Sequence, residues 1–422
     1  MLQVNFLRQN TELAKKKLAI KHFANLNLVD EVIAIDDQRK LLQASFDDIQ
    51  SKVNAASKEI GGHMAKGEKD KADALKNEVA EWKKQLEPLK EQMAAVEVNL
   101  QQVIVQFPNL PHDSVPLGKT PEENEVVRVG GETPNLHAGA EAHWDLIKKY
   151  NLVDFEIGAK ITGSGFPLYI GKGAKFQRVL TQYFLDFNTA AGYTEYLPPF
   201  MVNAASAFAT GQLPDKEGQM YHATEDDFYL IPTAEVPVTN VFRDTVLKET
   251  DLPIQMTAYS PCFRREAGSF GKDVRGLNRV HQFEKVEIIQ IVHPDKSDAV
   301  LDEMVAHVEK LLISLGLPYR ILRLCGGDMG FASAITYDFE VYSAAQERWL
   351  EVSSVSNFMA YQTYRMKCRF KDADGKTQFA HSLNGSSLAL PRILACLLEN
   401  HQTVSGIAIP AALQPYFGAA TI

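Results

Sequence analysis

The sequence of 422 residues is poor in cysteine and has no long hydrophobic run. Its four cysteines, Cys262, Cys325, Cys368 and Cys396, form no CxxC pair. Their spacing indicates neither a zinc site nor a disulfide framework and favours a reducing compartment. No run approaches the about 18 apolar residues of a membrane span, and the start, MLQVNFLRQN, lacks the apolar centre of a signal peptide. We therefore expect a cytoplasmic protein without a membrane segment.

Two common nucleotide-binding motifs are missing as well. No GxxxxGK[ST] sequence occurs, and no GxGxxG follows a strand-like segment, which excludes the P-loop and the dinucleotide-binding fingerprint. The net charge of −9 argues against bulk affinity for nucleic acid, but it does not exclude a local basic surface.

Glycine and proline are scarce in residues 1–107, where the pattern predicts helix. In residues 32–60 and 75–107, apolar side chains recur at a spacing of three and four, and Arg39 is the one break in the first run. The segment between the runs, GGHMAKGEKDKAD, predicts a turn. We expect an antiparallel two-helix coiled coil, kinked but not broken at Pro88, which lies off the apolar seam.

Four lysines gather around this turn: Lys66, Lys69, Lys71 and Lys76. The arm has as many basic as acidic residues, so the rest of the chain carries the negative charge. Lysines at the tip of such an arm could meet a phosphate backbone. A solvated helical face of mixed charge is the alternative interpretation.

The remaining chain has a different pattern. Residues 107–124 are rich in proline and polar residues and predict a linker, which we extend over 108–130. From 131 to 422, strand-like and helix-like segments alternate without a βαβ order. This predicts an α+β fold, with an antiparallel sheet flanked by helices. We expect strands in DFYLIPTAEVPVTNVFRD, PIQMTAYSPCFRRE, NRVHQFEKVEIIQIV and RWLEVSSVSNF, and helices in AKFQRVLTQYFLDFNTAAG, SDAVLDEMVAHVEKLLISLG and SLALPRILACLLENHQ.

Residues 263–287, FRREAGSFGKDVRGLNRVHQFEKVE, combine arginines, carboxylates and an aromatic ring. The alternation of a strand places Phe283, Lys285 and Glu287 on one face. Arginine suits phosphate, an aromatic ring can stack on a purine, and a carboxylate can accept from an amine. We interpret the stretch as a nucleotide clamp, a hairpin whose loop carries Lys272 and Arg275. A surface hairpin with cross-strand ion pairs is the alternative.

The same stretch resembles motif 2 of seryl-tRNA synthetases, a class II aminoacyl-tRNA synthetase family. TAE at 233–235 resembles the serine-binding TxE signature, and residues 383–400 resemble motif 3. LEVSSVSN at 350–357 resembles the acidic strand before motif 3, and GYTEYLPPFMV at 192–202 resembles motif 1, which helps form the class II dimer. The helical arm and the linker also resemble the bacterial layout, so the resemblance covers nearly the whole chain.

The resemblance implies a serine–tRNA ligase. Such an enzyme activates serine with ATP to seryl-adenylate and transfers serine to the 3′ end of tRNA(Ser), with tRNA(Sec) as a further candidate acceptor. Arg264, Arg392 and Glu351 would carry the catalytic roles. The implied ATP-binding residues are Arg264, Arg265, Glu266, Arg279, Val280, Phe283, Glu351, Val352, Ser353, Ser354 and Arg392.

Within this set the resemblance implies separate roles. Arg264 would hold the α-phosphate, Glu266 would read the adenine amine, and Arg279 would meet the outer phosphates. Phe283 and Arg392 would cover the two faces of adenine.

The implied serine-binding residues are Thr233, Ala234, Glu235, Arg264, Glu287, Asn384 and Ser386. Thr233 and Glu235 would bind the serine ammonium group, and Glu287 and Ser386 would read the hydroxyl group.

The resemblance also implies a magnesium ion, a partner and a division of the chain. Glu351 and Ser354 would ligate Mg²⁺ with ATP, whereas the intact TxE contains no cysteine and so implies no zinc. Residues 1–107 would bind tRNA through the tip lysines, residues 131–422 would form the catalytic domain, and motif 1 implies a homodimer.

Two other functions are weighed against this one. A truncated homologue that charges a carrier protein would lack the long arm. A non-catalytic RNA-binding protein on a retained synthetase fold would be expected to lose Arg264, Glu351 or Arg392, and all three are present.

Overall fold

The computed structural model describes residues 1–267 and 275–422, which form two compact units. One unit contains Leu2–Ala19 and Phe23–Pro108, and the other contains Met1, Ile20–His22 and Asn109–Ile422. Lys272, expected in the loop of the nucleotide clamp, lies outside the described residues. None of the helices in the described ranges combines the length and the apolar character that crossing a membrane requires.

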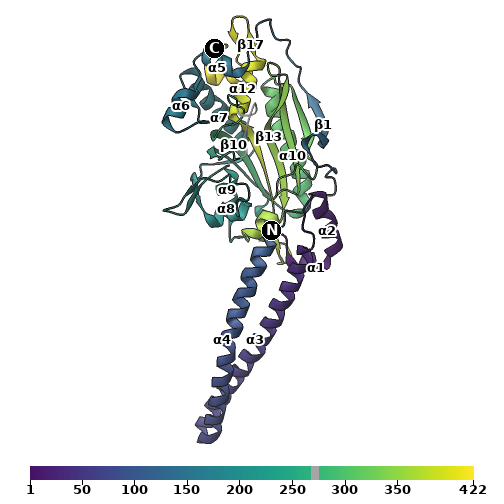
Figure 1. The fold of residues 1–422 in the computed structure, drawn as a ribbon, viewed down its shortest axis with the longest axis vertical. Helices are drawn as coiled ribbons and strands as arrows, with labels where there is room; N and C mark the ends of the chain where they lie inside the picture. Colours follow the sequence, from purple (N-terminus) through teal and green to yellow (C-terminus); the bar gives the residue numbers. More distant parts are fainter. Residues whose placement is uncertain (268–274) are drawn as a thin grey trace. The chain divides into compact units, whose positions relative to one another are not determined.

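The first unit is built on two long helices that run side by side (Figure 1). Its helices are α1 (Val4–Gln9), α2 (Thr11–Ile20), α3 (Leu28–Ala65) and α4 (Lys69–Ile104). Val53, Ala56, Val79 and Leu86 are buried between α3 and α4, which confirms the predicted coiled coil. The turn is shorter than the sequence predicted. Helix α3 continues through the two adjacent glycines at the start of the predicted turn, and only residues 66–68 separate α3 from α4.

Arg39 and Pro88, the two exceptions to the helical pattern of the arm, have local explanations. Arg39 donates to Asp36 over 2.8 Å, and Arg8 and Lys40 also contact this buried carboxylate. Burial alone would raise the pKa of Asp36, but the three cations hold it well below its usual range. Helix α4 continues through Pro88, whose ring is exposed, so the helix is not broken there.

The second unit contains an eight-stranded sheet with the order β1-β11-β12-β13-β16-β10-β9-β4. Neighbouring strands are antiparallel, except that β4 is parallel to β9. This confirms the predicted α+β class. The strands are β1 (Glu125–Gly130), β4 (Thr194–Tyr196), β9 (Ile254–Phe263), β10 (Gln282–Val292), β11 (Tyr319–Arg323), β12 (Ile335–Ser343), β13 (Arg348–Met359) and β16 (His381–Ala389).

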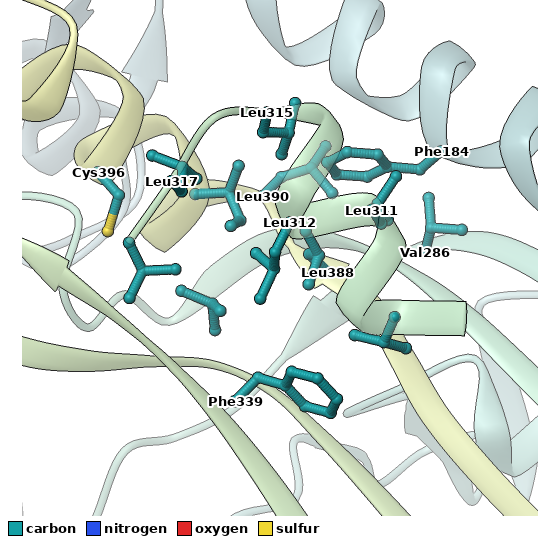
Figure 2. Close-up of a cluster of buried hydrophobic side chains, with 14 of the residues drawn as sticks. Phe184, Val286, Leu311, Leu312, Leu315, Leu317, Phe339, Leu388, Leu390 and Cys396 are labelled. Carbon is teal, nitrogen blue, oxygen red and sulfur yellow. The ribbon is translucent and has the colours of Figure 1, made fainter. Parts of the chain in front are cut away.

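Three helices pack their apolar side chains against one face of this sheet. They are α7 (Lys172–Ala190), α10 (Ser297–Ser314) and α12 (Leu390–Asn400). Figure 2 shows Phe184 of α7, Leu311 of α10 and Cys396 of α12 gathered with Val286 and Phe339 of the sheet. Because side chains alternate along a strand, the neighbours of these core residues point to the opposite face.

Shorter elements surround the sheet. The remaining helices of the unit are α5 (His143–Lys149), α6 (Phe155–Ile161), α8 (Ala204–Thr210), α9 (Glu235–Thr239), α11 (Tyr361–Arg365) and α13 (Gln414–Phe417). The remaining strands are β2 (Val153–Asp154), β3 (Leu168–Tyr169), β5 (Met201–Asn203), β6 (His222–Ala223), β7 (Phe228–Leu230), β8 (Val246–Lys248), β14 (Arg369–Lys371), β15 (Thr377–Phe379), β17 (Gln402–Thr403) and β18 (Gly406–Ile407).

Three segments differ from the sequence-based expectation. Strand β1 lies inside the range assigned to the linker and pairs with β11 at one edge of the large sheet. Residues 227–244, expected as strand, form only the short β7 before α9 and a 3-10 turn. Strand β16 extends to Ala389, so α12 begins at Leu390, and Pro391 occupies its first turn, where a missing N–H is tolerated.

Candidate functional site

The expected serine and ATP residues gather around one cavity of about 1060 Å³. Alternate residues of β10 and β12 contribute to its wall, together with residues of β13 and β16. The expected residues that line it are Thr233, Glu235, Arg264, Glu266, Arg279, Val280, Phe283, Glu287, Glu351, Val352, Ser353, Ser354, Asn384, Ser386 and Arg392. Two expected residues lie outside this lining: Ala234 is buried in a neighbouring core, and Arg265 is exposed.

Glu287 is the centre of a buried polar group at one side of the cavity. Only 2 % of this residue is exposed, and it forms an ion pair with Lys285. Thr233 Oγ1 donates to Glu287 Oε1 over 2.8 Å, and Ser386 Oγ donates to the same oxygen over 3.3 Å. Ser386 faces Glu287 because the two residues are register partners in β16 and β10. Three side chains from three segments therefore converge on one carboxylate.

Glu235 is a second buried carboxylate in the same wall. It starts helix α9, and Gln362 Nε2 of α11 donates to its Oε1 over 2.6 Å. Burial raises the pKa of Glu235 to about 7, and the charge of Glu287 acts in the same direction, while hydrogen bonds from Gln362 and Asn384 oppose the shift. Glu235 is thus poised between its neutral and charged forms near neutral pH.

Arg264 and Phe283 lie against one another across the neighbouring strands β9 and β10. The guanidinium carbon of Arg264 is 5.2 Å from the centroid of the Phe283 ring. The backbone of Arg264 is fixed by a hydrogen bond of 2.9 Å from its N–H to the carbonyl oxygen of His281. A cation–π contact therefore holds the arginine over one part of the ring.

Glu266 and Arg279 form an ion pair at the cavity wall. Arg279 Nη1 lies 2.8 Å from Glu266 Oε2. Glu266 has a positive φ of 50°, a backbone conformation that a non-glycine residue adopts at some energetic cost. The geometry brings together two residues for which the resemblance implied different ATP contacts.

Arg392 links the start of α12 to two segments of the cavity wall. Its Nε donates to the carbonyl oxygen of Asn278 over 2.9 Å, and its Nη1 donates to the carbonyl oxygen of Glu351 over 2.7 Å. Nη1 also lies 3.5 Å from the Glu351 carboxylate. These contacts orient the guanidinium group from both sides.

Acidic side chains of β12 and β13 approach one another beside Arg392. Glu340 pairs with Glu351 in the register of the two strands, and Asp338 pairs with Ser354, whose hydroxyl donates to the Asp338 carboxylate. Burial raises the pKa of Asp338 well above its usual range, and the charge of Glu351 raises it further. A bound cation would relieve this repulsion between like charges.

The chemistry of these donors fits Mg²⁺. Carboxylate and hydroxyl oxygens are hard ligands, and Mg²⁺ in nucleotide sites takes one or two carboxylates together with phosphates and water. Within the described ranges no group of three or more His, Cys, Asp or Glu side chains converges as in an all-protein metal centre. The protein thus offers a partial ligand set, as a metal shared with a phosphate requires.

Sequence reasoning assigned no role to three residues of this site. Lys285 shares a strand face with Phe283 and Glu287, so alternation contained the signal. Asp338 lies on β12, whose acidic residues alternate with core residues. Gln362 lies in a short helix outside the motifs, and no sequence pattern indicated its contact with Glu235.

The four tip lysines belong to the other compact unit. Lys66 follows the end of α3, and Lys69, Lys71 and Lys76 lie in the first turns of α4. All four are exposed. Lys71 lies 3.1 Å from Glu68, and Lys76 lies 2.8 Å from Asp73, so acidic neighbours partly compensate their charge.

Family models match both units of the chain. Residues 1–111 match the seryl-tRNA synthetase N-terminal domain. Residues 219–401 match the tRNA synthetase class II core domain of the glycine, histidine, proline, serine and threonine enzymes. The second match spans the whole stretch from Gln219 to His401 that contributes most of the cavity wall.

Relatives of known name match along the entire chain. A serine–tRNA ligase of Salinibacter ruber is 48% identical over 424 residues, which cover 100% of this chain and 99% of the relative. The chain belongs to the seryl-tRNA synthetase family. A second family member, a serine–tRNA ligase of Akkermansia muciniphila, is 45% identical over 99% of this chain and 98% of its own length.

Solved structures of the seryl-tRNA synthetase family share the fold. The seryl-tRNA synthetase of Pyrococcus horikoshii, crystallised in complex with ATP, superposes with a TM-score of 0.92 at 30% identity and covers 100% of this chain and 99% of its own. The cytoplasmic serine–tRNA ligase of Naegleria fowleri, in complex with AMP, gives a TM-score of 0.87 at 28% identity. The resemblance stated from the sequence is thus confirmed at the level of family and fold.

Proposed function

We propose that this protein is a serine–tRNA ligase. It activates L-serine with ATP to seryl-adenylate and diphosphate, and it transfers serine to the 3′ end of tRNA(Ser), with tRNA(Sec) as a second candidate acceptor. The observation that carries the proposal is the whole-length identity of 48% to a serine–tRNA ligase. A cavity lined by four arginines and by the buried polar group around Glu287 supports it.

The serine subsite lies around Glu287 and Glu235. Glu235 and Thr233, which flank Ala234 of the serine-binding set, bind the ammonium group, and Glu287 with Ser386 reads the hydroxyl group, with Asn384 beside them. Alanine would leave the buried Glu287 without its hydroxyl partner, which disfavours alanine strongly. Threonine keeps the hydroxyl, so its rejection has to be steric.

The nucleotide subsite lies toward Phe283 and Arg392. Adenine lies between these two side chains and meets Glu266 at its amine, while Arg264 faces the α-phosphate and Arg279 the outer phosphates. Arg265, Val280, Val352 and Ser353 complete this subsite. Since Arg279 and Glu266 pair with one another in the structure, ATP binding has to separate them.

The reaction needs no protein nucleophile. The serine carboxylate attacks the α-phosphorus and diphosphate departs in line; the 3′ hydroxyl of tRNA then attacks the acyl carbon and AMP departs. Arg264 holds the reacting phosphate, and Arg264 and Arg392 stabilise its charge, so positioning and electrostatics supply the catalysis. Glu351 and Ser354 would hold Mg²⁺, which would neutralise phosphate charge when bound. The exposed guanidinium of Arg265 is the least supported member of the set.

We further propose an arrangement for the whole enzyme. Residues 1–107 bind tRNA through Lys66, Lys69, Lys71 and Lys76. Residues 131–422 activate serine and form the dimer, and residues 108–130 are the linker between these two domains. The enzyme works as a cytoplasmic homodimer. A homodimer is proposed because the segment resembling motif 1 includes β4, a terminal strand of the large sheet.

ATP–diphosphate exchange with each amino acid in turn, in the presence of Mg²⁺, tests the function. We expect exchange with serine alone, followed by charging of tRNA(Ser) when that tRNA is added. Exchange with a different amino acid would reassign the substrate. A folded protein that supports exchange with none would favour a non-catalytic RNA-binding role, and serine activation without tRNA charging would favour a carrier protein as acceptor.

A further inference from the structure

A fully buried histidine–glutamate pair lies behind the ATP wall of the cavity. His143, at the start of α5, and Glu399, near the end of α12, both have side chains that are 0% exposed. His143 Nδ1 lies 2.7 Å from Glu399 Oε1, and the backbone N–H of His143 donates to the same oxygen over 2.8 Å. Neither residue lines the cavity, and neither belongs to the expected serine or ATP set.

The other ring nitrogen of His143 binds a segment that does line the cavity. The backbone N–H of Leu277 donates to His143 Nε2 over 2.9 Å. Because Nε2 must accept this bond, the ring proton resides on Nδ1 and is donated to Glu399. Leu277 is itself 0% exposed, so its N–H has no water as a substitute partner.

The neighbours of Leu277 contact the same helix. The Arg275 guanidinium lies 4.2 Å from the ring centroid of Trp144, the residue after His143. Gly276 has a φ of +63°, and a Cβ atom at this position would lie only 2.3 Å from His143 Nε2. Residues 275–277 are therefore fitted closely onto the start of α5.

A second series of hydrogen bonds connects Glu399 to Arg392. Gln346 Nε2 donates to Glu399 Oε1 over 2.9 Å, and Gln346 Oε1 accepts from Asn278 Nδ2 over 3.0 Å. The carbonyl oxygen of Asn278 accepts from Arg392 Nε. Glu399 thus fixes residues 277–278 through two routes, and those residues in turn fix Arg392 and precede Arg279.

We propose that His143 and Glu399 are positioning residues for ATP. They hold the backbone of Leu277 and Asn278 so that Arg279 and Arg392 meet the nucleotide, and they act on neither serine nor the reacting atoms directly. This inference rests on the proposed function, since Arg279 and Arg392 are assigned there to ATP. The inference predicts that disruption of the His143–Glu399 pair raises the KM for ATP and leaves the KM for serine unchanged.

The test compares three variants of the full-length protein in serine-dependent ATP–diphosphate exchange. His143→Leu keeps the approximate volume of the side chain but removes the acceptor for Leu277, and we expect it to raise the KM for ATP about tenfold and to leave the KM for serine unchanged. His143→Gln retains an acceptor near the position of Nε2 and should restore most of the ATP affinity. His401→Leu is the matched control, because His401 donates to the Leu315 carbonyl oxygen over 3.0 Å and lies outside the cavity lining.

A purely structural role would give a different result. If His143→Leu lowered kcat, or the fraction of active protein, with both KM values unchanged, the positioning role would be overturned. If His143→Leu did not fold, Gln346→Leu would decide, since it breaks only the second series of hydrogen bonds; an unchanged KM for ATP in that folded variant would also overturn the proposal. Absence of serine-dependent exchange in the wild-type protein would refute the proposed function instead, and ATP affinity measured by calorimetry on the same variants would then decide the positioning role.

Discussion

Glu287 illustrates how a single buried carboxylate can define a small polar pocket. A buried anion is stable only when it is paired and hydrogen-bonded, and Lys285, Thr233 and Ser386 satisfy this requirement at one of its oxygens. These three side chains, all within the described residues, contact Oε1 of the carboxylate, which makes Oε2 the natural acceptor for a substrate hydroxyl. Discrimination by such a group depends on the penalty that an unpaired buried partner brings.

The role proposed for Glu235 predicts that serine binding depends on pH. Burial raises its pKa to about 7, so the carboxyl group is neutral below this pH and becomes charged as the pH rises through it. In the proposed function, the serine ammonium group binds the charged form of Glu235. We therefore expect the KM for serine to fall about tenfold between about pH 6 and pH 8, measured by ATP–diphosphate exchange.

Glu235→Gln separates this effect from other titrations. The amide cannot ionise, so the variant should bind serine more weakly and with a KM that no longer changes over the same pH range. The KM for ATP provides an internal comparison, because Glu235 is not assigned to the nucleotide. A wild-type KM for serine that stayed constant from pH 6 to pH 8 would show that Glu235 is already charged throughout.

At the scale of residues, the sequence revealed those site members that occur in motifs. Phe283 and Glu287 follow the alternation of a strand, and the structure brings both to the cavity. Gln362 and His143 could not be found in this way, because their contacts with Glu235 and Glu399 join segments more than a hundred residues apart. Such contacts depend on how the helices pack against the rest of the fold, and local periodicity in the sequence does not predict that packing.

At the scale of elements, prediction succeeded where one face of an element is buried. The seam of α3 and α4 has an apolar stripe, and β10 alternates core and cavity residues, so each pattern matched its structure. Strand β1 was assigned to the linker because it lacks a buried face: Val126, Val127 and Val129 are all exposed. Its position is determined by backbone pairing with β11, which leaves no periodic signal in the side chains.

The helical arm provides a prediction at the same scale. Lys66 and Lys69 are exposed at its tip, next to the turn between α3 and α4. If they contact tRNA phosphates, the double change to glutamate should weaken tRNA charging about tenfold and leave serine-dependent ATP–diphosphate exchange unaltered. The logarithm of the tRNA binding constant falls with the logarithm of the salt concentration. Each lost phosphate contact should reduce the magnitude of this slope by about one.

Lys83→Glu is the matched control for the tip variant. Lys83 is also exposed on α4, but it lies farther along the helix, so the change alters the arm's charge without changing the tip. It should affect charging less than the tip variant does. An equal loss of exchange and charging in the tip variant would contradict the proposed division of labour between the two parts of the chain.

At the scale of the whole molecule, the large sheet ends in two strands that have a neighbour on one side only. These are β1 and β4. Terminal strands leave backbone groups available for pairing, and proteins usually cover or charge them. Both ends carry exposed apolar side chains: Leu197, directly after β4, is 78% exposed, and Val129 in β1 is 65% exposed.

The two edges allow the proposed homodimer to be tested with an internal control. Because the β4 segment resembles motif 1, we expect Leu197→Asp to convert a dimer into monomers, since it would place a charge without a partner in an apolar interface. Val129→Asp makes the same chemical change at the opposite edge and should leave the dimer intact. Sedimentation velocity at micromolar concentration reports both outcomes. A monomeric wild-type protein would refute the homodimer, and dissociation by Val129→Asp alone would move the interface to the β1 edge.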